Sequence, residues 1–101
     1  MDLTLAELRS LALHRAVANK LAAEPLATLA IANANLANAI HRGTTHPTYA
    51  NAWRVLLALP LAELLVKLID ESQEMRDLRQ ASPFAGVLTP RERWKILDAT
   101  R

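Results

Sequence analysis

Three histidines are the side chains of this sequence best suited to acid–base or metal chemistry. His41 and His46 flank a stretch that looks like a loop, and His14 lies in the middle of a helical pattern. A helical zinc motif needs a second histidine or a carboxylate about one turn away, and none of the three has such a neighbour. Cysteine is absent, which excludes thiolate ligands. The sequence therefore predicts neither a metal site nor a bound cofactor.

Four carboxylates form the densest acidic cluster of the chain. Asp70, Glu71, Glu74 and Asp77 lie around the expected start of one helix. Acidic side chains stabilise a helix at that end by their interaction with its dipole. Basic side chains lie close enough in sequence to pair with them. We interpret the cluster as a solvated capping face, and we assign it no acid–base role.

The serines and glycines complete the search for catalytic groups. Ser10, Ser72 and Ser82 have no obvious base that would activate them as nucleophiles. Gly43 and Gly86 are the only glycines, which are too few for a glycine-rich phosphate loop. Because no catalytic grouping emerges, we expect a protein that is not an enzyme.

The stretch 78–94 carries the most distinctive pattern: the end of one helix, an apolar loop and the start of another helix. Pro83 disfavours a helical conformation at the residue before it, so the incoming helix should end near Ala81. Thr89, followed by a proline and then by Glu92, has the spacing of a capping box at a helix start. The apolar residues between these signals are unusual, because loops normally run over the surface in water.

Two interpretations of this loop stay open on the sequence alone. In the first, Phe84, Val87 and Leu88 plug the base of a helical core, since large apolar residues are usually buried. In the second, the loop is an exposed surface that a partner protein covers. Aromatic and arginine side chains are the types enriched at binding hot spots. The second interpretation predicts these partner-binding residues: Phe84, Val87, Trp94, Arg79, Arg91 and Arg93.

An alternative function is DNA binding by the C-terminal half, which has the outline of a helix-turn-helix. In its favour, Arg91 and Lys95 are four residues apart and share a helix face. Against it, carboxylates open the would-be recognition helix and would repel phosphates. This alternative, a transcriptional regulator, predicts these nucleic-acid-binding residues: Arg76, Arg79, Arg91, Arg93 and Lys95.

The composition indicates one all-α domain spanning residues 1–101. Hydrophobic residues make up 51% of the chain and are mainly alanine and leucine, which are strong helix formers. The 12 basic and 10 acidic residues leave a net charge of +2, too balanced to indicate a nucleic-acid partner by itself. The chain shows neither a transmembrane run nor a signal-peptide pattern, and it lacks cysteine. We therefore expect a soluble cytoplasmic protein that does not enter a membrane.

Apolar periodicity and capping signals predict a compact bundle of five or six helices. Thr4 and Glu7 have capping-box spacing at the start of the first helix. Gly43 is a candidate C-cap, and it begins the clearest break in the chain. The first helix is expected to begin near residue 5 and to end before 25, and the others to cover about 26–41, 47–59, 61–69, 72–81 and 90–99.

The second expected helix repeats its large residues at alternating spacings of three and four, as in a coiled-coil seam. An asparagine at such a position can fix the oligomeric state, or it can simply meet a neighbouring helix. Alanines cover the other faces and would let helices approach closely, which suits a central position in the bundle. The homodimer surface that this pattern predicts comprises Leu26, Leu29, Asn33, Leu36 and Ile40.

Two stretches resemble a group of small bacterial all-helical proteins. One is Leu13–Ala18 followed by Lys20, and the other is Leu78–Trp94, with the pattern LRQ-SPFAGVL-P-ERW. The resemblance spans nearly the whole chain, and such proteins are similar in size to antitoxins encoded beside a larger toxin gene. By this analogy of kind, together with the absence of catalytic groupings and the apolar loop beside arginines, we expect a non-enzymatic bacterial protein-interaction module that neutralises a partner protein such as a toxin. No residue roles are carried over with it.

Overall fold

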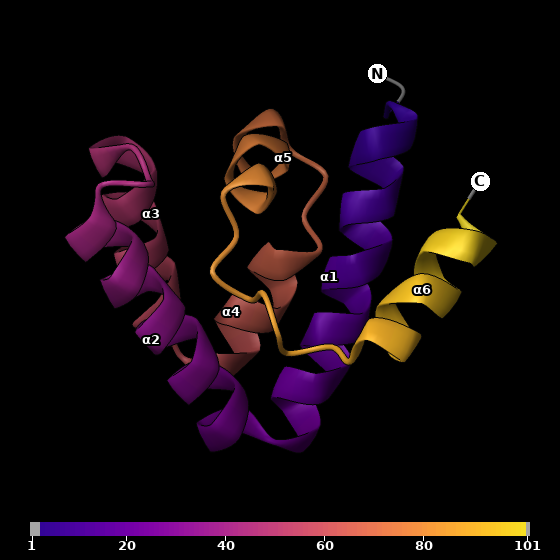
Figure 1. Ribbon diagram of the computed structural model, residues 1–101, viewed down its shortest axis with the longest axis horizontal. Helices are drawn as coiled ribbons and strands as arrows, with labels where there is room; N and C mark the ends of the chain where they lie inside the picture. Colours follow the sequence, from indigo (N-terminus) through magenta and orange to yellow (C-terminus); the bar gives the residue numbers. More distant parts are fainter. Residues whose placement is uncertain (1–2, 101) are drawn as a thin grey trace.

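Six α-helices form the regular structure of residues 3–100, the part of the chain that this computed structural model describes (Figure 1). No strand occurs within those residues, so the all-α prediction is confirmed. The bounds lie within a few residues of those expected from periodicity and capping. The helices are α1 (Leu5–Ala23), α2 (Pro25–Arg42), α3 (Pro47–Leu57), α4 (Leu61–Leu68), α5 (Gln73–Gln80) and α6 (Pro90–Ala99).

Both predicted capping boxes are present. The Thr4 hydroxyl accepts a hydrogen bond from the Glu7 backbone N–H at 3.1 Å, and the Glu7 carboxylate accepts one from the Thr4 N–H at 2.9 Å. Thr89 and Glu92 make the same reciprocal pair at the start of α6, at 3.1 and 3.0 Å. Each box satisfies backbone donors that a helix start leaves without intrahelical partners. Local sequence therefore sets these two starts.

The other boundaries follow the same local rules. Gly43 ends α2 in the left-handed conformation, with φ of +67°, which only glycine adopts at low energy. The Ser72 side chain caps α5 by accepting a hydrogen bond from the Met75 N–H. Pro25, Pro47 and Pro90 stand at the first positions of α2, α3 and α6, where a missing N–H carries no penalty.

The core forms around Trp53 on α3, which is fully buried. Its indole Nε1 donates a hydrogen bond to the Leu78 carbonyl at 3.0 Å, so the only polar atom of the ring is satisfied. The Phe84 ring packs edge-on against the indole, with ring centroids 5.9 Å apart. The interpretation of Trp53 as a core anchor is confirmed. Leucines from α1, α2, α3, α4 and α5 surround it: Leu21, Leu36, Leu56, Leu57, Leu64, Leu68 and Leu78.

The central element is α1, which packs against α2, α4, α5 and α6. Helix α2 packs on α1 and α3 and lies toward one side of the molecule, so its expected central position is wrong. Helix α6 rests on α1 at the opposite side (Figure 1). The segment between α5 and α6 crosses from one helix to the other in front of α1 in this view. Its Ser82 lies beside the middle of α1, where the Ser82 hydroxyl is hydrogen-bonded to His14.

The predicted homodimer seam on α2 does not form one exposed stripe. Leu36 is buried in the chain's own core, and Leu29 is half-buried against that core. Leu26, Asn33 and Ile40 are exposed, so Asn33 is not buried against a neighbouring helix of its own chain. Leu36 packs in the core of its own chain, so its side chain is not available to a second copy.

Candidate functional site

The loop between α5 and α6 decides between the two interpretations of Phe84. The Phe84 side chain is only 4% exposed and contacts the rings of Trp53 and His14. Val87 is half-buried against the core cluster. The core-plug interpretation is therefore confirmed, and the prediction that Phe84 anchors a partner is wrong. Trp94 behaves differently, because 65% of its surface is exposed.

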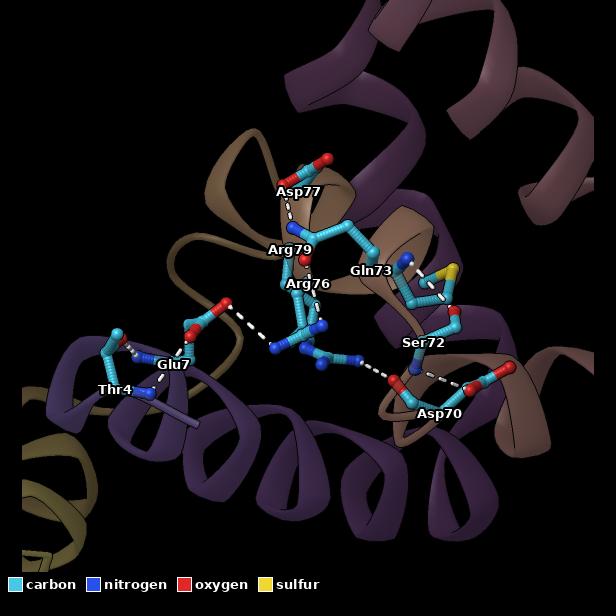
Figure 2. A network of polar contacts seen from close by, with 9 residues as sticks. Thr4, Glu7, Asp70, Ser72, Gln73, Arg76, Asp77 and Arg79 are labelled. Atoms are coloured by element: carbon cyan, nitrogen blue, oxygen red, sulfur yellow. Dashed lines mark hydrogen bonds and ion pairs between the residues drawn. The ribbon is translucent and has the colours of Figure 1, made fainter. Parts of the chain in front are cut away.

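Arg76 and Arg79 lie inside the protein, with exposed fractions of 8% and 3% (Figure 2). The Arg79 Nη1 donates to the carbonyls of Leu68 and Asp70, at 3.3 and 2.6 Å. Leu68 is the last residue of α4, whose final C=O groups lack intrahelical partners, and Asp70 lies in the turn that follows. Burial lowers the pKa of Arg79, although nearby carboxylates, Asp70 first among them, oppose the shift. Arg79 is therefore a structural cap of α4.

Arg76 connects α5 to the start of α1. Its Nη1 lies 3.6 Å from the Glu7 carboxylate, and its Nη2 donates to the Gln73 side chain at 2.8 Å (Figure 2). The pKa of Glu7 is lowered, mainly by its hydrogen bond from the Thr4 backbone and further by the charges of Arg76 and Arg79. Neither arginine is placed to contact DNA or a partner protein, and both site predictions for them are wrong.

Because these two arginines are buried, they do not contribute positive charge to the surface of the helix-turn-helix outline. The exposed side of α5, the would-be recognition helix, carries Glu74 and Asp77. A negative face would be repelled by phosphates. Of the basic residues predicted for DNA, those that remain exposed all lie on α6: Arg91, Arg93 and Lys95.

A groove of about 620 Å³ lies between α1, the 81–89 loop and α6. Its volume is within the range of small-molecule sites in proteins. His14 from α1 and Ser82 and Phe84 from the loop line it, and Arg93 and Leu97 from α6 contribute to it as well. The groove joins segments far apart in sequence.

A chain of hydrogen bonds fixes the loop to α1 in this groove. The His14 Nδ1 lies 2.7 Å from the Ser10 carbonyl, which can only accept, so Nδ1 carries the proton. The unprotonated Nε2 then accepts from the Ser82 hydroxyl at 2.8 Å. The Ser82 oxygen in turn accepts the Phe84 backbone N–H at 3.2 Å. This relay requires a neutral imidazole at its centre.

The environment of His14 keeps it neutral. Burial lowers its pKa to about 4, and the positive charge of Arg79 acts in the same direction. The hydrogen bond to Ser10 opposes the shift without cancelling it. Ser82 therefore has a base within hydrogen-bond distance, which corrects the expectation that it has none. An imidazole with so low a pKa is a weak general base. The hydrogen bonds of His14 instead hold the loop against α1.

Asn35 on α2 holds the other side of the same loop. Its side-chain amide donates to the carbonyls of Pro83 and Ala85, both at 2.8 Å. Sequence reasoning considered Asn33 and overlooked Asn35, because no local pattern distinguishes two asparagines of an Ala/Asn-rich helix. The loop is therefore fixed from two helices, and the groove has a defined wall.

The stretches 13–20 and 78–94 meet in this region. His14 and Phe84, one from each stretch, pack edge-to-face with ring centroids 6.4 Å apart. Lys20 and Glu92, again one from each, form an ion pair of 3.2 Å between α1 and the start of α6. No local sequence pattern indicated that residues near 14 and 82 are neighbours.

Comparison with protein-family models, curated proteins and solved structures finds no match for this chain. Within residues 3–100 no helix is long and apolar enough to cross a membrane. The same residues contain no group of three or more histidine, cysteine or carboxylate side chains placed to hold a metal ion.

Proposed function

We propose that this chain is a non-enzymatic protein-interaction module whose docking surface is the outer face of α6. The observation that carries the proposal is Trp94, a tryptophan 65% exposed on a helix that has no buried residue. The other tryptophan is fully buried. A large exposed indole flanked by arginine is typical of a binding hot spot. Of the apolar anchors predicted from the sequence, Trp94 is the one whose ring is largely exposed.

The charges around Trp94 indicate an acidic partner. Arg91, Arg93 and Lys95 are exposed on the same helix, and they make no intramolecular hydrogen bond or ion pair identified within residues 3–100. Two acidic residues lie near them: Glu92 is engaged with Thr89 and Lys20, and Asp98 has an interaction of its own. A partner with an apolar pocket rimmed by carboxylates would be complementary in shape and charge.

The specific form of the proposal is antitoxin-like neutralisation in the bacterial cytoplasm, in which binding blocks the activity of the partner. The resemblance of the stretches 13–20 and 78–94 to small bacterial helical proteins motivates this form. The lack of cysteine fits a reducing compartment. No catalytic step by this chain is part of the mechanism, which requires only that the docked α6 covers the partner's working surface.

The test compares Trp94→Ala with Val55→Ala in nuclease-treated affinity capture from the native cell. Val55 is a matched control, because it is also 65% exposed but lies on α3. We expect one stoichiometric partner with the wild type and with Val55→Ala, and its loss with Trp94→Ala. Release of that partner by salt would confirm an acidic surface. Equal capture by both variants would remove α6 as the docking surface.

DNA binding remains the alternative, and it would now rest on Arg91, Arg93 and Lys95 alone. The observation in its favour is that all three are exposed on one short helix. Phosphate contacts weaken steeply with salt. A labelled duplex bound with a steep salt dependence, together with loss of protein partners on nuclease treatment, would favour this alternative over protein docking.

A further inference from the structure

The groove between α1, the 81–89 loop and α6 has a one-sided charge. Three arginines line it, namely Arg9 from α1, Arg79 from α5 and Arg93 from α6, and no carboxylate lines it. His14, the other titratable side chain of the wall, is held neutral by burial. Clefts lined by charges of one sign attract ligands of the opposite sign. The groove therefore favours an anion.

The three arginines occupy different depths. Arg93 is exposed and stands at the rim. Arg9 is half-buried, and its Nε is fixed by a hydrogen bond of 3.2 Å to the Thr100 carbonyl, which ties α1 to the end of α6. Arg79 belongs to the inner wall, and its Nε and Nη2 are buried without a hydrogen-bond partner within residues 3–100. Its neighbouring carboxylates, Asp70 and Glu71, lie outside the groove lining.

Apolar side chains make up much of the remaining lining, beside the polar Ser10, Gln80 and Ser82. Leu13 and Val17 come from α1, Leu88 from the loop and Leu97 from α6. A simple inorganic anion would leave the half-buried Leu13, Leu88 and Leu97 in contact with water. A ligand with a hydrocarbon body would cover them, and removing apolar surface from water favours binding. The combination of an apolar floor with a cationic rim fits an amphipathic anion.

We propose that this groove binds a free organic carboxylate with an apolar body, of the size of a medium-chain fatty acid. The hydrocarbon part lies along the leucines, and the carboxylate pairs with Arg93 and Arg9 at the rim. Arginine is suited to this role because its planar guanidinium binds a carboxylate through two parallel hydrogen bonds. The site goes beyond the proposed docking function, since Trp94 is not part of the groove lining.

The test titrates the wild-type chain with decanoate and with decanol, which has the same chain length without the charge. Binding is followed by isothermal calorimetry and by the backbone amide NMR signals of Ala85, Gly86 and Leu97, which report on the groove wall. We expect decanoate to bind at least tenfold more tightly than decanol, with the shifts concentrated at these signals. Equal affinities for the two would overturn the anion site.

Two arginines of α6 provide matched variants. Both Arg91 and Arg93 are exposed, but only Arg93 lines the groove. Because both are on the surface, their replacement by glutamine should leave the fold intact. Arg93→Gln should weaken decanoate binding about tenfold, the usual effect of losing a hydrogen bond to a charged group, while Arg91→Gln should not. An equal loss in both variants would indicate non-specific attraction by the helix and would overturn the proposal, as would groove signals that do not move.

Discussion

Acidification should destabilise this protein through one residue, His14. Its imidazole is buried, and its unprotonated Nε2 accepts the Ser82 hydroxyl, so the folded state favours the neutral ring. The pKa is lowered from 6.5 to about 4 in the folded protein. Between these values the unfolded chain binds more protons than the folded one, so stability falls as pH falls. The contribution is fully present above pH ~6.5 and is lost as the pH approaches 4.

The size of the effect follows from the shift of about 2.5 pKa units that these two values give. Each unit corresponds to about 1.4 kcal/mol, so complete protonation should remove roughly 3 kcal/mol from the free energy of unfolding. About 2 kcal/mol of this should already be lost between about pH 7 and pH 5. Glu7 and Glu92 have lowered pKa values because the backbones of Thr4 and Thr89 donate to them. The stability that these two carboxylates contribute is therefore lost at a lower pH than the contribution of His14.

The assay is urea unfolding followed by circular dichroism across this pH range, for the wild type, His14→Gln and His41→Gln. Glutamine does not titrate, so His14→Gln should lose the 2 kcal/mol dependence, whatever its stability at neutral pH. His41 is exposed at the end of α2, so its variant should behave as the wild type does. An NMR titration of the wild-type imidazole should show a midpoint near 4. The reasoning fails if His14→Gln keeps the wild-type pH dependence or if that midpoint lies near 6.5.

Three further perturbations test the placement of individual side chains. Phe84→Ala should lower the free energy of unfolding by about 3–5 kcal/mol, because it opens a cavity beside Trp53. Trp94→Ala should change the free energy of unfolding by less than about 1 kcal/mol, because the Trp94 ring is exposed. Similar urea midpoints for these two variants would contradict the assignment of one ring to the core and the other to the surface. Arg79→Ala should cost about 2–4 kcal/mol through the loss of its hydrogen bonds to two carbonyls, and an unchanged urea midpoint would show that they contribute little. Thr89→Ala should weaken the start of α6 by about 1 kcal/mol and accelerate amide hydrogen exchange there, and unaltered exchange in α6 would argue against the capping role.

The helices of this protein could be predicted from the sequence because their signals are local. The capping boxes join residues three apart, and Gly43 ends α2 by its own conformational freedom. Such contacts depend on the backbone of one turn, whatever the rest of the chain does. The alanine- and leucine-rich composition and the absence of cysteine set the all-α class and exclude disulfides in the same direct way.

Which way each side chain faces was decided only by the tertiary structure. Arg79 is turned inward because the end of α4 presents carbonyls that need a donor, and Trp94 is turned outward because α6 rests on α1 by another face. The His14–Ser82 hydrogen bond joins residues 68 positions apart. No periodicity encodes a contact of that separation, because it exists only once α1, the loop and α6 have packed together. The sequence by itself determined the helices, and their packing determined the groove.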